Sequence, residues 1–557
     1  MLSARAWMAS AAVCVLLLAL LLPGLGYRHL WQDEIETAER ARTILESGLP
    51  RVVDASGMAS LNAGGKELEE GTLHRYTPWA QFYWAAWGLK LSRSLGLNSD
   101  AGVRFPFVLA HAAAATALAG GLTAFGALGP VSAAGISLVW GLESIRLLHN
   151  RTARYHALID LLVVAGLLAV GALRGSALWA RPLLFIVIFL LPQVQTLGGS
   201  LFSLLLAAGA AHVLWRKQVQ ARRGAWVRDC LKSLALPGFL SLAVLLVLCR
   251  PWASTWGRLD GPSLKSLRDV GGSMIPLLFW SGSGFWLRRR GERGLARVIF
   301  WAVGLSVALT ALAESHPQSQ PRYYLAFGIL GFFWPLALGW GGLPVRARQR
   351  YWTSVLAALC FSELVLWALP VFINDQTRVH THAPLQGLRL VLHDRDEARR
   401  GARQPLRQAL DMMRQGEGPV LIDYVPQFVN WYLPGREPAL MPDPVYRGRA
   451  NGDNPVWDRP RQRPAWHLWY PKFGSGTWEC KPGCDFHVEG DDWAAGRYTL
   501  VSREMGRQEM CVARTWATQQ WNNAPFMNLR ASAFQPQGQE DGPLVLARPC
   551  RFLAAAR

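Results

Sequence analysis

The sequence predicts an α-helical polytopic membrane protein of about 11 transmembrane helices, followed by a C-terminal α/β extracytoplasmic domain. Three observations predict this fold class. Apolar runs, each near the roughly 20 residues that a helix needs to cross a bilayer, follow one another up to about residue 373. The composition is 51% hydrophobic and only 17% charged. Beyond Asn374 the chain is polar, interrupted by Pro and Gly and rich in Trp, as expected of a water-facing domain of ordinary size.

These runs divide the chain into a transmembrane domain, 1–373, and a soluble C-terminal domain, 374–557. Residues 27–103 are expected to form the first extracytoplasmic loop, with juxtamembrane helices. The first apolar run is expected to be an uncleaved anchor, because no small-x-small cleavage site precedes Tyr27; a cleaved signal peptide is the alternative. The spans expected are approximately 7–25, 104–126, 130–148, 160–174, 181–197, 199–215, 233–250, 272–287, 297–314, 323–341 and 351–373.

Three basic loops predict the topology, because Lys and Arg near the ends of spans stay on the cytoplasmic side. They are RKQVQARRGAWVRDCLK at 216–232, RRRGERGLAR at 288–297 and RARQR at 346–350. A chain that starts inside and crosses at each expected span places all three in the cytoplasm and the C-terminal domain outside. This arrangement of inside and outside loops requires that the amphipathic stretch 78–97 lies in the membrane interface and does not cross.

The same topology brings several polar segments to the non-cytoplasmic face of the membrane. These are Asp33 and Glu34, the stretch HNRTARYHALID at 149–160, the loop 252–270 and HPQSQPRYY at 316–324. Ionisable groups at the ends of apolar helices are costly unless they are paired or functional, so they are candidate site residues. The alternative for Arg154, Asp160 and Arg322 is that they extend to lipid head groups.

Several of these stretches resemble one enzyme family. Asp33-Glu34 followed by ETAERARTILESGLPR, then HRYTPWAQFYW at 74–84, GVRFPFVLAHA at 102–112, RTARYHALIDLLVVAG at 151–166 and QPRYYLAFG at 320–328, follow the family's order. The chain resembles the C-type (GT-C fold) glycosyltransferases that use polyprenyl-phosphate sugars. The closest groups are the bacterial relatives of protein O-mannosyltransferases and the 4-amino-4-deoxy-L-arabinose transferases that modify lipid A. The resemblance covers about residues 7 to 373.

The resemblance implies an integral membrane glycosyltransferase of the bacterial inner membrane, acting on its periplasmic side. A sugar would pass from a polyprenyl-phosphate donor to a cell-envelope acceptor, which is a lipid, a glycan or a protein, as in lipopolysaccharide or protein glycosylation. Transfer of this kind needs a base for the acceptor hydroxyl and positive charge for the departing phosphate. Direct displacement at the anomeric carbon predicts inversion.

The expected site residues follow from these needs. Asp33 is the expected general base, with Glu34 and Asp160 as the other catalytic carboxylates. The residues expected to bind the donor phosphate are Arg322, Tyr323, Arg258, Arg268 and Arg75, because Arg binds phosphate with a planar fork and stays charged. Those expected to bind acceptor or sugar are His74, Arg154 and Tyr155. A divalent metal, Mg or Mn, is a further expectation, with Asp33 and Asp160 as ligands.

One segment departs from the family pattern. Where the arabinose-transferring relatives have Glu-Lys before a Pro-Pro pair, this chain has His74-Arg75-Tyr76-Thr77-Pro78. The missing Glu argues against an aminoarabinose donor and against a metal site copied from those enzymes.

The C-terminal domain holds Cys480, Cys484, Cys511 and Cys550. In an oxidising compartment this even set predicts two disulfides, with three possible pairings. The alternative is a zinc site formed by CKPGC and His487. The stretch 418–435 is predicted to form a strand, a turn and a helix.

Other function classes fit the sequence less well. The formal net charge of +20 is carried largely by loops beside spans, so nucleic acid is not an expected partner; membrane lipid is. The chain lacks a phosphate-binding G-x-x-x-x-G-K motif, which disfavours an ATP-driven pump. Two alternatives remain: a transporter or lipid-binding protein whose polar residues line a path, and an inactive glycosyltransferase-like scaffold.

Overall fold

The computed structural model describes residues 4–55, 71–75, 77–175, 177–218, 223–249, 384–401, 405–422, 427–436, 462–469, 486–489, 496–502, 505–517 and 543–554, with isolated residues elsewhere. The chain forms two compact units. The helical unit comprises Met1–Pro23, Arg75–Gln81 and Arg104–Leu392. The mixed unit comprises Gly24–His74, Phe82–Val103 and His393–Arg557, so it contains both an early segment and the C-terminal part of the sequence.

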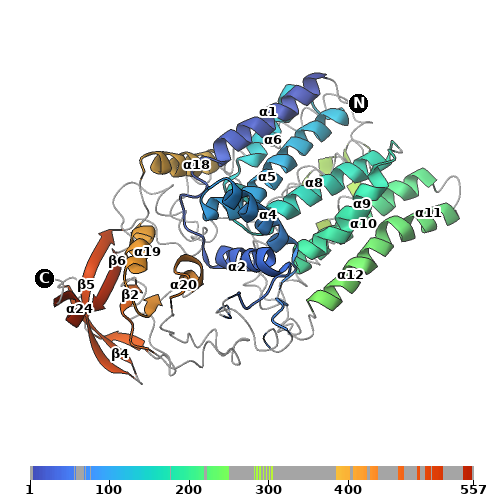
Figure 1. Cartoon of the computed structure of the whole chain (residues 1–557). Helices are drawn as coiled ribbons and strands as arrows, with labels where there is room; N and C mark the ends of the chain where they lie inside the picture. The colour runs from blue at the N-terminus through green and yellow to red at the C-terminus, as the bar shows by residue number, and fades with distance from the viewer. Residues whose placement is uncertain are drawn as a thin grey trace. The chain divides into compact units, whose positions relative to one another are not determined.

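Apolar helices lie side by side in the helical unit, where α9 packs against α8, α10 and α12, α8 also packs against α10, and α1 packs against α6 (Figure 1). Small residues permit this close packing, as in other membrane helices. A Cβ at Gly166 of α8 would lie 2.5 Å from the side chain of Leu206 on α10. The helices in chain order are α1 (Ala4–Leu21), α5 (Ser99–Ala124), α6 (Pro130–Gly141), α7 (Ser144–Asn150), α8 (His156–Leu173), α9 (Ala180–Val194), α10 (Thr196–Gln218), α11 (Arg223–Cys230), the π-helical turn η1 (Leu231–Ala235) and α12 (Leu236–Leu248).

Five helices of the described part are long and apolar enough to cross a membrane: Ala4–Leu21, Ser99–Ala124, His156–Leu173, Gly198–Trp215 and Trp226–Leu248. Pro130–Gly141 and Ala180–Val194 are shorter apolar helices. Each of the first seven expected spans therefore overlaps an apolar helix. The last four, from 272–287 onward, fall largely outside the described residues, so the number of about 11 crossings stays a prediction.

The segment at 78–97 forms α4 (Ala80–Ser94), which is not among the helices apolar enough to cross. Its faces differ, since Phe82 and Leu89 are buried while Trp87 is 45% exposed. One side of α4 thus packs against protein, and the expected place of this segment in the membrane interface stays a prediction.

The span expected over 130–148 is not one continuous helix. α6 ends at Gly141, and α7 begins at Ser144 after a turn at Leu142 and Glu143. The turn is held by side chains from inside the unit: His111 bonds the carbonyl oxygen of Gly141 at 2.8 Å, and the Glu143 carboxylate pairs with Arg146. Burial of these polar groups ends the helix, which hydropathy alone does not reveal.

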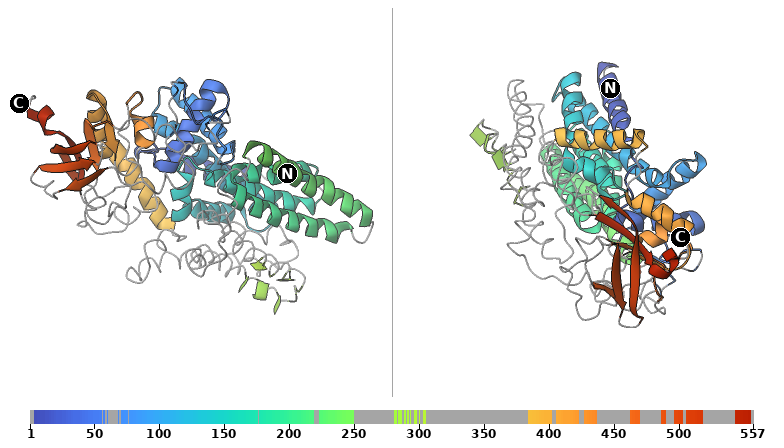
Figure 2. Two further views of the ribbon diagram at one scale, coloured as in Figure 1. Left: turned by 90° about the horizontal axis from the view of Figure 1, so that it is seen from below. Right: turned by 90° about the vertical axis from the view of Figure 1, so that its left-hand side faces the viewer.

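The mixed unit contains a six-stranded sheet whose order is β1-β2-β6-β5-β4-β3 (Figure 2). β1 and β2 are parallel, and the other neighbours are antiparallel. One apolar cluster on the sheet consists of Leu421, Tyr498, Leu500, Met510, Val545 and Ala547. The strands are β1 (Val420–Ile422), β2 (Trp466–Trp469), β3 (Phe486–Glu489), β4 (Arg497–Ser502), β5 (Gly506–Ala517) and β6 (Pro543–Pro549).

The helices of the mixed unit include α2 (Gln32–Ser47), α19 (Pro405–Gln415), α20 (Gln427–Tyr432) and α24 (Cys550–Ala554), and the boundary between the units falls within α18 (Pro384–Arg399). β1 followed by α20 confirms the strand, turn and helix predicted over 418–435. The fold class, a protein with several apolar helices and a C-terminal domain built on a sheet, is likewise confirmed.

Asp100 connects the early segment to the C-terminal part within the mixed unit. Its Oδ2 accepts hydrogen bonds from Tyr432 Oη at 2.9 Å and from Arg407 at 2.5 Å, and Oδ1 accepts one from the Trp431 indole. A second ion pair joins Arg28 to Asp394 at 2.8 Å. Residues 24–74 and the chain after 393 thus belong to one unit. The boundary predicted at 373 lies outside the described residues and stays a prediction.

A disulfide joins Cys511 on β5 to Cys550 at the start of α24. It agrees with one pairing of the cysteines in this domain; Cys480 and Cys484 lie outside the described residues. The bridge closes a loop with a sequence separation of 39 residues. Closing a loop of this length lowers the entropy of the unfolded chain and stabilises the folded one by about 4 kcal/mol.

We therefore expect the double variant Cys511→Ser, Cys550→Ser to unfold at lower urea concentration than the wild type. Pulse proteolysis of the full chain in urea measures the midpoint, and the Cys249→Ser variant, which changes a free cysteine, is the control. Equal midpoints for the double variant and the wild type would contradict a stabilising bridge.

Candidate functional site

Asp33 and Glu34 occupy the first turn of α2, and the structure separates their environments. The side chain of Glu34 is fully buried, and its Oε2 accepts a hydrogen bond from the backbone N–H of Trp31 at 3.2 Å. This contact satisfies one of the amide groups that a helix leaves unpaired at its start. Asp33 is only half-buried. The structure thus gives Glu34 a capping contact, and the expected catalytic roles of both carboxylates stay predictions.

His74 lies beside α2, although 40 residues of sequence separate it from Glu34. Its Nε2 is 3.9 Å from Oε1 of Glu36, and its ring contacts Phe82 edge to face with centroids 5.0 Å apart. The backbone N–H of His74 donates to the carbonyl of Pro50, which fixes the segment against the end of α2. His74 is therefore buried next to a carboxylate, and its expected contact with the acceptor stays a prediction.

Asp160 lies at the centre of a buried polar network in the helical unit. Its Oδ2 accepts hydrogen bonds from Arg146 Nη1 and Asn150 Nδ2, each at 2.9 Å. Arg146 also donates from Nε to Glu143 at 2.8 Å, and both members of that pair are at most 1% exposed. A buried guanidinium that bridges two carboxylates compensates the cost of removing all three charges from water.

The network extends to His111 on α5 and determines its tautomer. Nε2 of His111 lies 2.8 Å from the carbonyl oxygen of Gly141, which can only accept, so this nitrogen carries the proton. Nδ1 then accepts from Asn150 Nδ2 at 2.8 Å. Asn150 donates both of its amide hydrogens, one to His111 and one to Asp160. Asp160 is thus tied through side chains to the end of α6, and the observed contacts position rather than expose it.

Arg154 and Tyr155 lie in the short connection between α7 and α8. Both are buried, and the guanidinium carbon of Arg154 is 5.4 Å from the centre of the Tyr155 ring. The Tyr155 ring in turn packs on His156, with centroids 4.3 Å apart. Cation–π and ring packing explain why this connection is compact. The expectation that these two residues bind acceptor or sugar stays a prediction.

Arg75 contacts the end of α12 within the helical unit. Its Nη1 donates to the carbonyl of Leu248 at 2.8 Å and to that of Val247 at 3.2 Å. These carbonyls belong to the last turn of α12, where backbone acceptors lack helical partners and a cation is favourable. Arg75 thus caps α12. Arg322, Tyr323, Arg258 and Arg268 lie outside the described residues, so donor phosphate binding stays a prediction for all five.

The described residues contain no group of three or more His, Cys, Asp or Glu side chains that could hold a metal ion. Asp33 belongs to the mixed unit and Asp160 to the helical unit. A metal held by this pair stays a prediction, and no step of the mechanism below passes through one.

Sequence reasoning missed the partners of Asp160. Glu143 and Arg146 fall inside an apolar run, and an acid three residues before a base in such a run is a recognisable signal of a buried pair. His111 and Asn150 give no such signal, because they are 39 residues apart and meet only in the folded unit. Glu39, which lies 3% exposed on α2 above a cavity, was also missed.

The solved structures that are similar to this chain include two structures of ArnT from Cupriavidus metallidurans. The one bound to undecaprenyl phosphate is similar over 88% of this chain and 97% of its own, at 15% identity and a TM-score of 0.48. The apo structure is similar over 86% and 95% respectively, at 15% identity and a TM-score of 0.49. No family model and no curated protein sequence matches the chain.

Proposed function

We propose that this protein is an integral membrane glycosyltransferase that moves a sugar from a polyprenyl-phosphate donor to a cell-envelope acceptor. The observation that carries the proposal is the position of Asp33. It is half-buried in the first turn of a polar helix, α2, that follows the first apolar helix, α1, after a short connection in the sequence. The ordered resemblance of residues 7–373 to polyprenyl-phosphate-dependent glycosyltransferases supports the same reading.

In the proposed reaction Asp33 takes the proton from the acceptor hydroxyl as that oxygen attacks the anomeric carbon. The bond between this carbon and the phosphate oxygen breaks, and the electron pair leaves with polyprenyl phosphate. A glycosidic bond forms with inversion, and the proton ends on the Asp33 carboxyl. General base catalysis of this kind contributes about 100- to 10,000-fold to the rate. Arg residues would stabilise the departing phosphate, and Arg322 and Tyr323 are the proposed contacts.

We further propose that Asp160 acts as a positioning carboxylate. It is held by Arg146 and Asn150, which orient it and the start of α8. The proposed acceptor contacts are His74, Arg154 and Tyr155, and the proposed location of the reaction is the periplasmic face of the inner membrane. Sugar and acceptor identity depend on the contacts of the bound molecules, since small differences in contacts decide between related sugars.

A donor panel tests the proposed function. The purified full chain, in lipid nanodiscs, is incubated with a set of polyprenyl-phosphate sugars, with added Mg²⁺ or Mn²⁺ or with EDTA, and sugar release or transfer is followed. We expect slow hydrolysis or transfer from at least one donor, with polyprenyl phosphate as the second product. Failure to consume any donor, together with movement of labelled lipid across proteoliposomes, would overturn the proposal in favour of a transporter. The EDTA arm decides metal dependence.

A further inference from the structure

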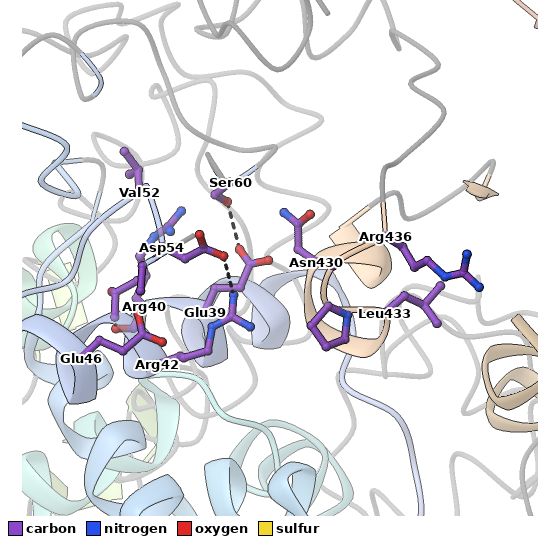
Figure 3. Close-up of a pocket in the computed structure, with 14 residues that line it drawn as sticks. Glu39, Arg40, Arg42, Glu46, Val52, Asp54, Ser60, Asn430, Leu433 and Arg436 are labelled. Carbon is purple, nitrogen blue, oxygen red and sulfur yellow. Dashed lines mark hydrogen bonds and ion pairs between the residues drawn. The ribbon is translucent and has the colours of Figure 1, made fainter. Parts of the chain in front are cut away.

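A cavity of about 300 Å³ lies within the mixed unit, between α2 and the segment that contains α20 (Figure 3). Its walls come from Glu39 and the neighbouring Arg side chains of α2, from the loop with Asp54 and Ser60, and from Asn430 and Leu433. The volume is at the small end of the range of ligand pockets, which begins at about 300 Å³. None of the catalytic roles proposed above uses this cavity.

Glu39 is the most unusual group in its wall, because it is a carboxylate only 3% exposed. Oε2 accepts a hydrogen bond from Ser60 Oγ at 2.9 Å. Among the residues that the structure describes, Oε1 has no hydrogen-bond partner of ordinary length. Figure 3 shows the side chain of Asn430, which comes from α20, pointing toward Glu39. Buried polar atoms are nearly always hydrogen-bonded, so this oxygen has the capacity for a further hydrogen bond.

Burial raises the pKa of Glu39 above its ordinary value of 4.5, and the charges of Arg40 and Arg42 and the contacts with Ser60 and Asn430 oppose that rise. The folded chain therefore holds this proton more tightly than the unfolded chain. By linkage, the contribution of Glu39 to the free energy of unfolding decreases as the pH rises above 4.5.

The Arg side chains of the wall are already engaged at their ends. Arg42 Nη2 is 3.5 Å from Asp54 Oδ2, and Arg40 Nη1 donates to the Arg51 carbonyl at 2.9 Å. Arg436 donates to the carbonyls of Met413 and Gly418, and its guanidinium points away from Glu39 in Figure 3. The Nε–H groups of Arg40 and Arg42 are buried without a hydrogen-bond partner among the described residues. The wall therefore offers donors as well as an acceptor.

The charges of the lining favour an uncharged occupant. The cationic side chains Arg40, Arg42 and Arg436 are balanced by the acidic side chains of Glu39, Glu46 and Asp54. A phosphate would meet the carboxylates and an amine would meet the guanidinium groups. A hydroxyl group accepts from an Arg Nε–H and donates to a carboxylate at the same time, and a planar Asn amide can do both as well. A sugar carries several such hydroxyl groups on one small ring.

We propose that this cavity is a binding site for a neutral saccharide, with Glu39 of α2 and Asn430 of α20 as the side chains that contact its hydroxyl groups. The site lies in the mixed unit and binds without a chemical step, so its test does not depend on glycosyl transfer. The sugar comes either from a soluble oligosaccharide or from the head group of a glycolipid, which present the same hydroxyl groups.

Saturation-transfer NMR on the full chain in lipid nanodiscs tests this site, because maltoside detergents carry a competing sugar. One arm adds maltose, lactose or the N-acetylglucosamine disaccharide; a second incorporates digalactosyl diacylglycerol; a third adds inorganic phosphate or ethanolamine. The variants are Glu39→Met, Asn430→Leu and the matched control Glu509→Met, which removes an exposed carboxylate on β5 of the same unit. Thermal unfolding shows which variants fold. If Glu39→Met does not fold, Asn430→Leu still tests the site.

We expect saturable binding of at least one neutral saccharide by the wild type and by Glu509→Met. Each of Glu39→Met and Asn430→Leu removes hydrogen bonds to the sugar, and we expect each to lower the affinity about tenfold. Response in the first or the second arm identifies a soluble or a lipid-linked sugar. Binding of phosphate or ethanolamine that depends on Glu39, binding of sugar unchanged in all variants, or no sugar binding in either arm would overturn the proposal.

Discussion

Replacing Asp33 with Asn is expected to lower the rate of sugar transfer by about 100- to 10,000-fold, the contribution of a general base. The substitution keeps the size of the side chain and removes its ability to take the acceptor proton. Because the change affects proton transfer and not the donor phosphate, the affinity for the donor should change little. Single-turnover transfer and donor binding, both measured on the purified full chain, separate the two effects.

Glu34→Gln is the matched control, because it changes the neighbouring carboxylate of the same helical turn. Its Oε2 accepts the Trp31 N–H, so the loss of charge should weaken the start of α2 by about 1 kcal/mol and leave transfer largely intact at moderate temperature. If Glu34→Gln abolished transfer while Asp33→Asn retained it, the two roles would have to be exchanged. If both variants retained full activity, the proposed base would be wrong.

Replacing Arg146 with Met is expected to destabilise the protein by about 3–5 kcal/mol, the cost of removing one partner of a buried ion pair. Arg146 bonds both Glu143 and Asp160, and these carboxylates are 0% and 3% exposed. Without the guanidinium, the two buried acids would lose the cation that bridges them. Thermal unfolding of the full chain in nanodiscs measures the loss, and Arg146→Met with Asp160→Asn should recover part of it.

Arg181→Met is the control for this prediction. Arg181 pairs with Asp229 at 2.6 Å, but its side chain is 49% exposed, so water screens the pair and its loss should cost less than about 1 kcal/mol. Both variants replace an Arg on a helix of the helical unit. The side chain of Arg146 is buried, whereas that of Arg181 is exposed. Equal losses of stability would contradict the conclusion that the network around Asp160 holds this part of the unit together.

Much of the fold could be predicted from the sequence because its signals are local. Apolar runs near the length of a span correspond to α1, α5, α8, α10 and the segment ending in α12. The polar and aromatic residues of 78–97 predicted that α4 does not cross, and VLID followed by NWY predicted β1 and α20. The run at 130–148 is the exception. Its hydropathy is continuous, but Glu143 is bonded to Arg146 inside the unit and interrupts the helix.

The candidate site could be predicted only in part, because the sequence shows only those features that depend on neighbouring residues. A carboxylate pair after an apolar run, as at Asp33 and Glu34, is visible in the sequence. Which of them caps the helix depends on the backbone geometry at Trp31, and that appears only once α2 has formed. Arg75 has the charge expected of a phosphate ligand, but it caps α12, whose end lies more than 170 residues later in the chain.

The sequence by itself determined that the chain has a series of apolar helices, an acidic first turn after the first of them, and a polar C-terminal domain with an internal sheet. Hydrophobic length and periodicity act over tens of residues, so the order of side chains is enough to establish these features. Only the tertiary structure decided that His111 and Asn150 orient Asp160, and that Glu39 and Asn430 face one cavity. Partners so distant in sequence are brought together by packing, and the cost of burying a charge then selects which of them must pair.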